Sequence, residues 1–156
     1  MMLHRARRYD EAIEQCQRAL EIEPNYPNAL WFLSLSLEQT GRLTESVAQL
    51  EKAVRLSPVP LFRALLGRAY ALVGERKKAE DILEELKSLS QRQYVSPFDI
   101  AVVYAGLKDP DSAFQWFEAA YQQRVFRIIE LVLPMFDTLR SDTRWQDLVR
   151  RIGLPL

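Results

Sequence analysis

Apolar residues recur along this chain at three- and four-residue spacing, which is the spacing of amphipathic helices. Leu30, Leu33 and Leu37 share one helical face, and Gly41 follows where a left-handed residue can end a helix. A second apolar run ends at Pro58, which cannot continue a helix. The pattern therefore predicts pairs of helices joined by short turns.

The pair of helices recurs with a period of 34 residues. That shift places Glu11, Gln15, Ala19 and Pro24 on Glu45, Gln49, Ala53 and Pro58, and later Tyr70, Ala71, Ala79 and Glu84 on Tyr104, Ala105, Ala113 and Glu118. The middle units are offset by 33, because one residue is missing near residues 57–62. A fixed period of this length is typical of stacked helical hairpins. We therefore predict an all-α fold.

The positions that repeat resemble the tetratricopeptide repeat (TPR). The residues at its marker positions are Leu30, Leu33, Ser34, Leu37, Ser46, Leu50, Ala53 and Pro58 in the second unit; Arg63, Leu66, Gly67, Tyr70, Ala79, Leu83 and Leu86 in the third; and Ile100, Ala101, Tyr104, Ala113, Phe117 and Ala120 in the fourth. The departures are Ser34 and Ala101 in place of glycine, and Arg63 in place of the first aromatic residue. The resemblance implies a right-handed α-solenoid of TPR helix hairpins.

We divide the chain into a TPR array over residues 1–122 and a C-terminal capping segment over residues 123–156. The array has units at about 9–24, 27–58, 60–93 and 94–122. In the capping segment, Pro134 interrupts the pattern, and a last helix begins near Ser141 or Asp142. Its apolar residues are Trp145, Leu148, Val149 and Ile152, and Gly153 ends it. An amphipathic helix with a charged outer face is suited to closing a solenoid.

The first unit supplies only its second helix, because residues 1–8 are too few for a complete partner helix. We expect this half-unit to leave an apolar face open at the N-terminal edge. Two interpretations remain: the chain is the tail of a longer array, or residues 1–6 form one frayed turn.

The segments "VVYAGLKDPDSAFQWFEAAYQQR" and "FDTLRSDTRWQDLVRRIGL" carry a narrower resemblance. They resemble the C-terminal TPR region of bacterial multidomain signalling proteins, including winged-helix transcriptional regulators and kinase-like proteins. The match departs at Thr143, where relatives have proline. This resemblance implies a sensory or scaffolding arm whose output domain lies upstream of the repeats.

Charge and composition narrow the possible partners. Twenty-one basic and twenty-one acidic residues balance, so no net field favours nucleic acid or an anionic membrane. The start of the chain lacks the apolar stretch of a signal peptide, and no apolar run is long enough to cross a bilayer. A single cysteine fits a reducing compartment. We predict a cytoplasmic protein.

The chain offers little for catalysis. His4 is the one histidine and Cys16 the one cysteine, so neither a catalytic triad nor a metal site has enough members. Cys16 falls on an inward helix position and is interpreted as a core residue. No glycine-rich phosphate loop is present. We predict that the protein is not an enzyme and holds no cofactor or metal.

The resemblance also implies where a partner binds. In TPR stacks the first helix of each unit lines a concave groove, and its lining positions here are Asn28, Trp31, Phe32, Leu35, Ala64, Arg68, Phe98, Asp99 and Val102. Only Asn28 and Arg68 match the carboxylate clamp of chaperone-binding relatives, so such a clamp is not expected. The groove is apolar and aromatic, which favours an apolar peptide or an amphipathic helix. Alternatively, Trp31, Phe32 and Leu35 pack against an upstream repeat or the chain's own tail.

These observations predict a protein–protein interaction module that serves as an arm of a bacterial regulator. The alternatives are a stand-alone adaptor and a regulatory subunit that self-associates through the open N-terminal edge. A nucleic-acid-binding helical repeat is a more remote alternative. The sequence does not identify the partner, the pathway or the oligomeric state.

Overall fold

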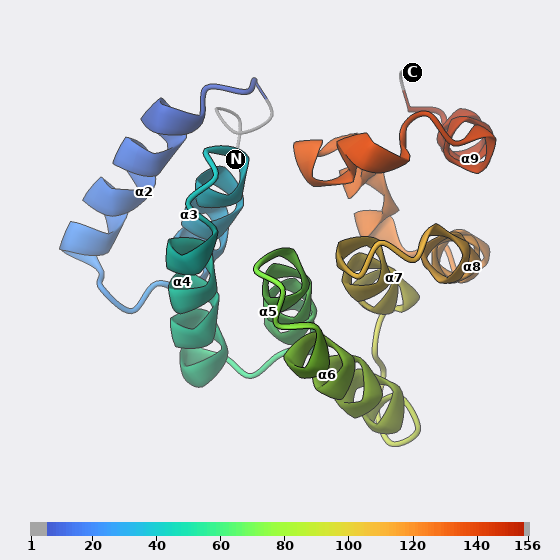
Figure 1. Cartoon of the computed structure of the whole chain (residues 1–156), viewed down its shortest axis with the longest axis horizontal. Coiled ribbons are helices and arrows are strands. Elements are labelled where there is room, and N and C mark those ends of the chain that lie inside the picture. The colour runs from blue at the N-terminus through green and yellow to red at the C-terminus, as the bar shows by residue number, and fades with distance from the viewer. Residues whose placement is uncertain (1–5, 155–156) are drawn as a thin grey trace.

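A computed structural model describes residues 6–154, in which every regular element is a helix and no strand occurs. Seven α-helices follow one another as antiparallel neighbours and form an arc (Figure 1). They are α2 (Tyr9–Ile22), α3 (Pro27–Gln39), α4 (Leu43–Leu56), α5 (Pro60–Leu72), α6 (Arg76–Leu89), α7 (Pro97–Gly106) and α8 (Pro110–Gln122). The predicted all-α hairpin solenoid is confirmed.

The turns explain why these helices begin and end where they do. Helices α3, α5 and α7 each begin with a proline, whose missing N–H costs nothing at that position. Gly41 follows α3 with a φ of 76°, a left-handed conformation that side chains disfavour. The chain therefore reverses direction at short turns and places each helix beside the previous one.

Small residues let the helices approach closely. Ala53, Ala79 and Ala113 occur once per hairpin and are each 0% exposed. Leucine and phenylalanine side chains from the facing helices fill the space around them. This alternation of small and large residues is the one expected from the repeating pattern.

The C-terminal segment does not simply add one more hairpin. Two 3-10 helices, η1 (Phe126–Val132) and η2 (Pro134–Leu139), precede the last helix, α9 (Thr143–Ile152). The predicted break at Pro134 is the start of η2. Asp142 caps α9 by accepting a hydrogen bond from the Arg144 N–H, and Gly153 ends it with a φ of 80°. The predicted bounds of α9 are therefore correct.

The N-terminal edge differs from our expectation. The described outward face of α2 is polar, and Ile22 at its end is the one large apolar side chain exposed on this helix. The buried stripe of α2, which includes Ala12 and Ile13, already packs against α3. An extensive apolar face is therefore absent from the described part of this edge. Residues 1–5, which include His4 and most of the expected N-terminal turn, lie outside the described residues.

Candidate functional site

The inner face of the arc is the candidate site, and the chain's own C-terminal segment lies in it. Figure 1 shows η1 and η2 on the concave side, between the first helices of the hairpins and α9. Helix η2 approaches α3, which lies far from it in the sequence. We call residues 126–139 the inner segment. Its contacts with α3, α5 and α7 define the geometry of the site.

An aromatic cluster joins the inner segment to α7 and α8. The Phe136 ring lies 5.9 Å from the Phe98 ring and 5.5 Å from the Phe117 ring, measured between centroids. All three side chains are 0% exposed. Edge-to-face contacts of this kind add to the stabilisation from burying the rings. Phe136 is therefore a core residue.

A buried charge cluster lies beside these rings. Arg127 forms an ion pair with Asp99 of α7, and its other nitrogens donate to Glu130 at 3.1 and 3.0 Å. Burial raises the pKa of the Asp99 carboxyl above its ordinary value, although the Arg127 guanidinium acts in the opposite direction. The Arg127 guanidinium also lies 5.2 Å from the Phe98 ring and 5.9 Å from the Trp31 ring. Arg127 thus connects α3, α7 and the inner segment.

A buried arginine holds the other end of the inner segment. Arg68 of α5 is 5% exposed, pairs with Glu38 of α3, and donates to the Met135 carbonyl oxygen at 3.2 Å. Its charge is therefore neutralised inside the fold. The Nε–H of Arg68 is buried and has no hydrogen-bond acceptor among the described residues.

The predicted groove residues fall into two groups. Leu35, Ala64, Arg68, Phe98, Asp99 and Val102 are buried, at 5% exposure or less. Asn28 is exposed, and Trp31 and Phe32 are half-buried. The inner segment contacts Arg68, Phe98 and Asp99, whereas Ala64 packs against α6 and α7. The accessible part of the predicted groove lies at the start of α3.

Trp31 forms the centre of this accessible part. Its ring stacks on Phe32 at 4.6 Å and meets the edge of Phe62 at 6.3 Å. Its indole N–H is buried and has no acceptor among the described residues. Both interpretations from the sequence are thus represented, because Trp31 borders the chain's own tail and is still partly exposed.

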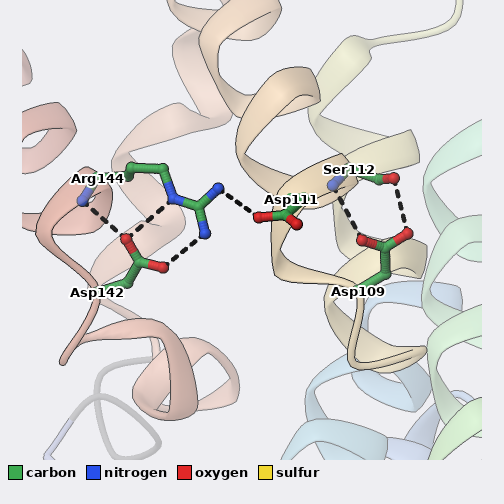
Figure 2. Close-up of polar contacts among 5 residues, drawn as sticks. All are labelled: Asp109, Asp111, Ser112, Asp142 and Arg144. Carbon is green, nitrogen blue, oxygen red and sulfur yellow. Dashed lines mark hydrogen bonds and ion pairs between the residues drawn. The ribbon is translucent and has the colours of Figure 1, made fainter.

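Residues of the capping helix make contacts that the sequence pattern did not predict. Arg144 bonds to Asp142 and, at 2.7 Å, to Asp111 of α8 (Figure 2). Asp109 caps α8 by accepting from the Ser112 N–H and hydroxyl (Figure 2). Arg151 pairs in the same way with Glu118, about two helical turns further along α8. These arginines attach α9 to α8. The sequence pattern predicts only that the charged side chains of this helix form its outer face.

The described residues offer few groups with chemical reactivity. Within residues 6–154, no group of three or more histidine, cysteine or acidic side chains could hold a metal ion. Cys16 is half-buried, and burial raises the pKa of its thiol, which disfavours the reactive thiolate. None of the helices in this part of the chain has the length and hydrophobicity needed to span a bilayer.

Comparisons with known proteins agree with the hairpin architecture. Residues 3–59 match the family model described as tetratricopeptide repeat. A TPR repeat-containing protein of Methanocaldococcus jannaschii is 28% identical over 97 residues, which is 62% of this chain. The chain spans only 30% of that relative's length. Residues 3–59 thus match the tetratricopeptide repeat, and helical hairpins of the same kind continue beyond them as far as α8.

Proposed function

Tetratricopeptide repeats are protein–protein interaction scaffolds, and we propose that this chain binds a peptide or helix of a partner protein at the start of α3. The proposed contact residues are Asn28, Trp31 and Phe32. The observation that carries this proposal is that Trp31 and Phe32 form a stacked, half-exposed aromatic pair on the concave face. Aromatic residues of this kind dominate the binding energy of many interfaces.

The polar surroundings of Trp31 support the same site. Arg127 lies beside the same ring, and its charge is already paired with Asp99 and Glu130. The ring therefore offers an apolar face with no unpaired charge next to it among the described residues. An apolar segment fits this site best.

The other predicted groove residues act differently in this proposal. We propose that four buried residues position the inner segment and do not contact the partner directly: Phe98, Asp99, Val102 and Arg68. We propose that residues 1–122 form the repeat array and that residues 123–156 both cap it and fill its concave face. The proposal includes no catalytic step, cofactor or metal, and it places the protein in the cytoplasm.

The test is a comparison of Trp31→Ala with Trp116→Ala, since both tryptophans are half-buried and only Trp31 lies on the concave face. Phage-displayed peptides would first be selected on the whole protein, and the enriched peptides would serve as probes. We expect Trp31→Ala to weaken their binding at least about tenfold, while Trp116→Ala leaves it unchanged. Circular dichroism should show that both variants keep their helicity. Equal binding by the Trp31→Ala variant would contradict the proposal.

We further propose that the module is the sensory or scaffolding arm of a bacterial regulator. The resemblance of residues 102–124 and 136–154 to the C-terminal TPR region of such regulators supports this role. An immunoblot of source cells with an antibody to residues 110–156 would measure the mass of the native polypeptide. A mass far above the 18.2 kDa of this sequence supports the regulator arm. A mass near 18 kDa favours a stand-alone adaptor or a self-associating subunit, which sedimentation at several concentrations would separate.

A further inference from the structure

The large exposed apolar side chains of this protein gather along one edge of the arc. Six such residues occur in the described part of the chain, and all lie where one hairpin passes to the next helix. They are Ile22, Tyr26, Leu56, Val59, Tyr94 and Phe126. Two of them are very exposed for aromatic side chains, Tyr94 at 69% and Phe126 at 79%. Scattered exposed apolar residues are ordinary, but their restriction to one kind of turn is not.

These turns share an edge because consecutive helices are antiparallel. The links from α2 to α3, α4 to α5 and α6 to α7 all follow the second helix of a hairpin, and Figure 1 shows them along the lower margin of the arc. Phe126 belongs to the same edge, because its neighbour Arg127 lies over Phe98 in the first turn of α7. We call three of these links, residues 54–60, 88–96 and 122–126, the turn rim; the α2–α3 link is left out because it carries Glu23.

The turn rim is also basic. It contains arginines at positions 55, 92 and 124 and no acidic residue. Arg55, Arg92 and Arg124 are exposed and form no ion pair with any residue in the described range 6–154. Most other arginines in this range, such as Arg63, Arg144 and Arg151, are paired with carboxylates. Each rim turn thus combines one unpaired arginine with an exposed apolar side chain.

From this arrangement we propose that the turn rim binds an acidic, apolar segment of a partner protein. The proposal rests on the proposed interaction function but uses a different surface from the site at Trp31. Arginine and aromatic residues are the types enriched at the energetic centres of interfaces. The partner's carboxylates would pair with the arginines, while its apolar side chains cover Tyr94, Phe126 and Val59.

The spacing of the turns defines the segment that fits. Packed helices lie about 8–10 Å apart, and α5 packs directly on α7. In a polyproline II conformation the chain rises about 3.1 Å per residue and completes a turn every three residues, so every third side chain points the same way, about 9 Å further along. An acidic residue at every third position, with leucine or phenylalanine between, therefore presents its carboxylates to successive rim arginines. An anionic membrane is a poorer fit, because a chain with no net charge is not drawn to it over a distance.

The probe is a fluorescent 12-residue peptide with glutamate at every third position and leucine before each glutamate, measured by fluorescence polarisation. A peptide with glutamine in place of glutamate is its control. We expect the acidic peptide to bind and the glutamine peptide to bind about tenfold more weakly, with the difference shrinking at high salt. Equal binding of the two peptides would overturn the proposal.

Variants of the whole protein identify the surface. The triple variant Arg55→Ser, Arg92→Ser, Arg124→Ser should weaken binding of the acidic peptide about tenfold, and Tyr94→Ser with Phe126→Ser should do the same. Arg150→Ser is the matched control, because Arg150 is also exposed and unpaired in the described range but lies on α9. It should bind like the unaltered protein. A triple variant that binds as tightly as the control would overturn the proposal.

Two further measurements distinguish binding at the turn rim from binding at the Trp31 site and from binding to a membrane. Trp31→Ala should leave acidic-peptide binding unchanged, so that a failure at the Trp31 site and a failure at the rim are distinguishable. Co-sedimentation with vesicles of phosphatidylglycerol and phosphatidylcholine tests the membrane alternative. Vesicle binding that depends on the rim arginines, without peptide binding, would replace the protein partner with a lipid surface.

Discussion

Buried charges hold the inner segment against the repeats. Asp99 is 4% exposed, and its partner Arg127 comes from a part of the chain 28 residues away. Arg68 is fixed in the same manner by Glu38 and by a backbone carbonyl. Ion pairs removed from water contribute little net stability, but losing one partner is costly. Their clearest effect here is to fix the position of residues 126–139.

Asp99 gives the protein a specific dependence on pH. Because burial raises the folded-state pKa of Asp99 above its unfolded value, the folded state holds this proton more tightly. The contribution of Asp99 to the free energy of unfolding is therefore greatest below the ordinary pKa of 3.8 and declines as the pH rises through the folded pKa. In Asp99→Asn this decline is absent. The free energy of unfolding of the variant minus that of the wild type should increase as the pH rises above 3.8.

Urea unfolding of both proteins from about pH 3.5 to pH 7 measures this difference, and the other carboxylates cancel because both proteins contain them. Glu21→Gln is a suitable control for the loss of one carboxylate, since Glu21 is exposed on α2. A flat difference for Asp99→Asn would show that Arg127 fully offsets the burial of the carboxylate.

Some of these residue roles could be predicted from the sequence and others could not. Pro27, Gly41 and Asp142 act locally, so their positions beside apolar runs were enough to predict turns and caps. Asp99 and Arg68 stood out as charges on an inner helical face. Their partners could not be predicted, because Arg127 and Met135 meet them only after the tail folds back over the concave face.

At the scale of helices, the contact between α5 and α7 depends on one glycine. A Cβ atom on Gly106 would lie 2.8 Å from the Arg68 Cγ atom and 2.9 Å from its Cα atom. The backbone of α5 cannot move away without separating the two helices. Gly67, on α5, differs because a Cβ there would meet only side-chain methyl carbons of Ile82 and Val103, at 3.0–3.3 Å.

Alanine at these two positions should therefore have different effects. We expect Gly106→Ala to lower the free energy of unfolding by about 1–2 kcal/mol, because overpacking outweighs the gain in helix propensity. Gly67→Ala should change it by less than about 1 kcal/mol, because the methyl groups can shift and alanine favours the helix. Chemical denaturation of the two variants measures both values. A Gly106→Ala variant as stable as the wild type would mean that α5 and α7 can separate without cost.

At the scale of the whole molecule, the inner segment changes how the solenoid is held together. In a simple repeat array each unit contacts only its neighbours, and stability is a sum along one dimension. Here Arg127 borders both α3 and α7, and η2 approaches α3. The periodicity of the sequence predicted the hairpins and the capping helix. It could not predict the crossing of the tail, because the repeat pattern stops before residue 126.

Phe136 is the best residue with which to test this coupling. It is 0% exposed between Phe98 and Phe117, so Phe136→Ala should lower the free energy of unfolding by about 3–5 kcal/mol. Because the inner segment bridges distant units, amide hydrogen exchange should accelerate in α3 as well as in α7 and α8. Phe114→Ala is the matched control, since Phe114 is buried on α8 beside Arg144 and does not belong to the inner segment. Its effect should concentrate in α7, α8 and α9. If Phe136→Ala also left α3 protected, the repeats would behave as independent neighbours, and the inner segment would cap only the C-terminal end.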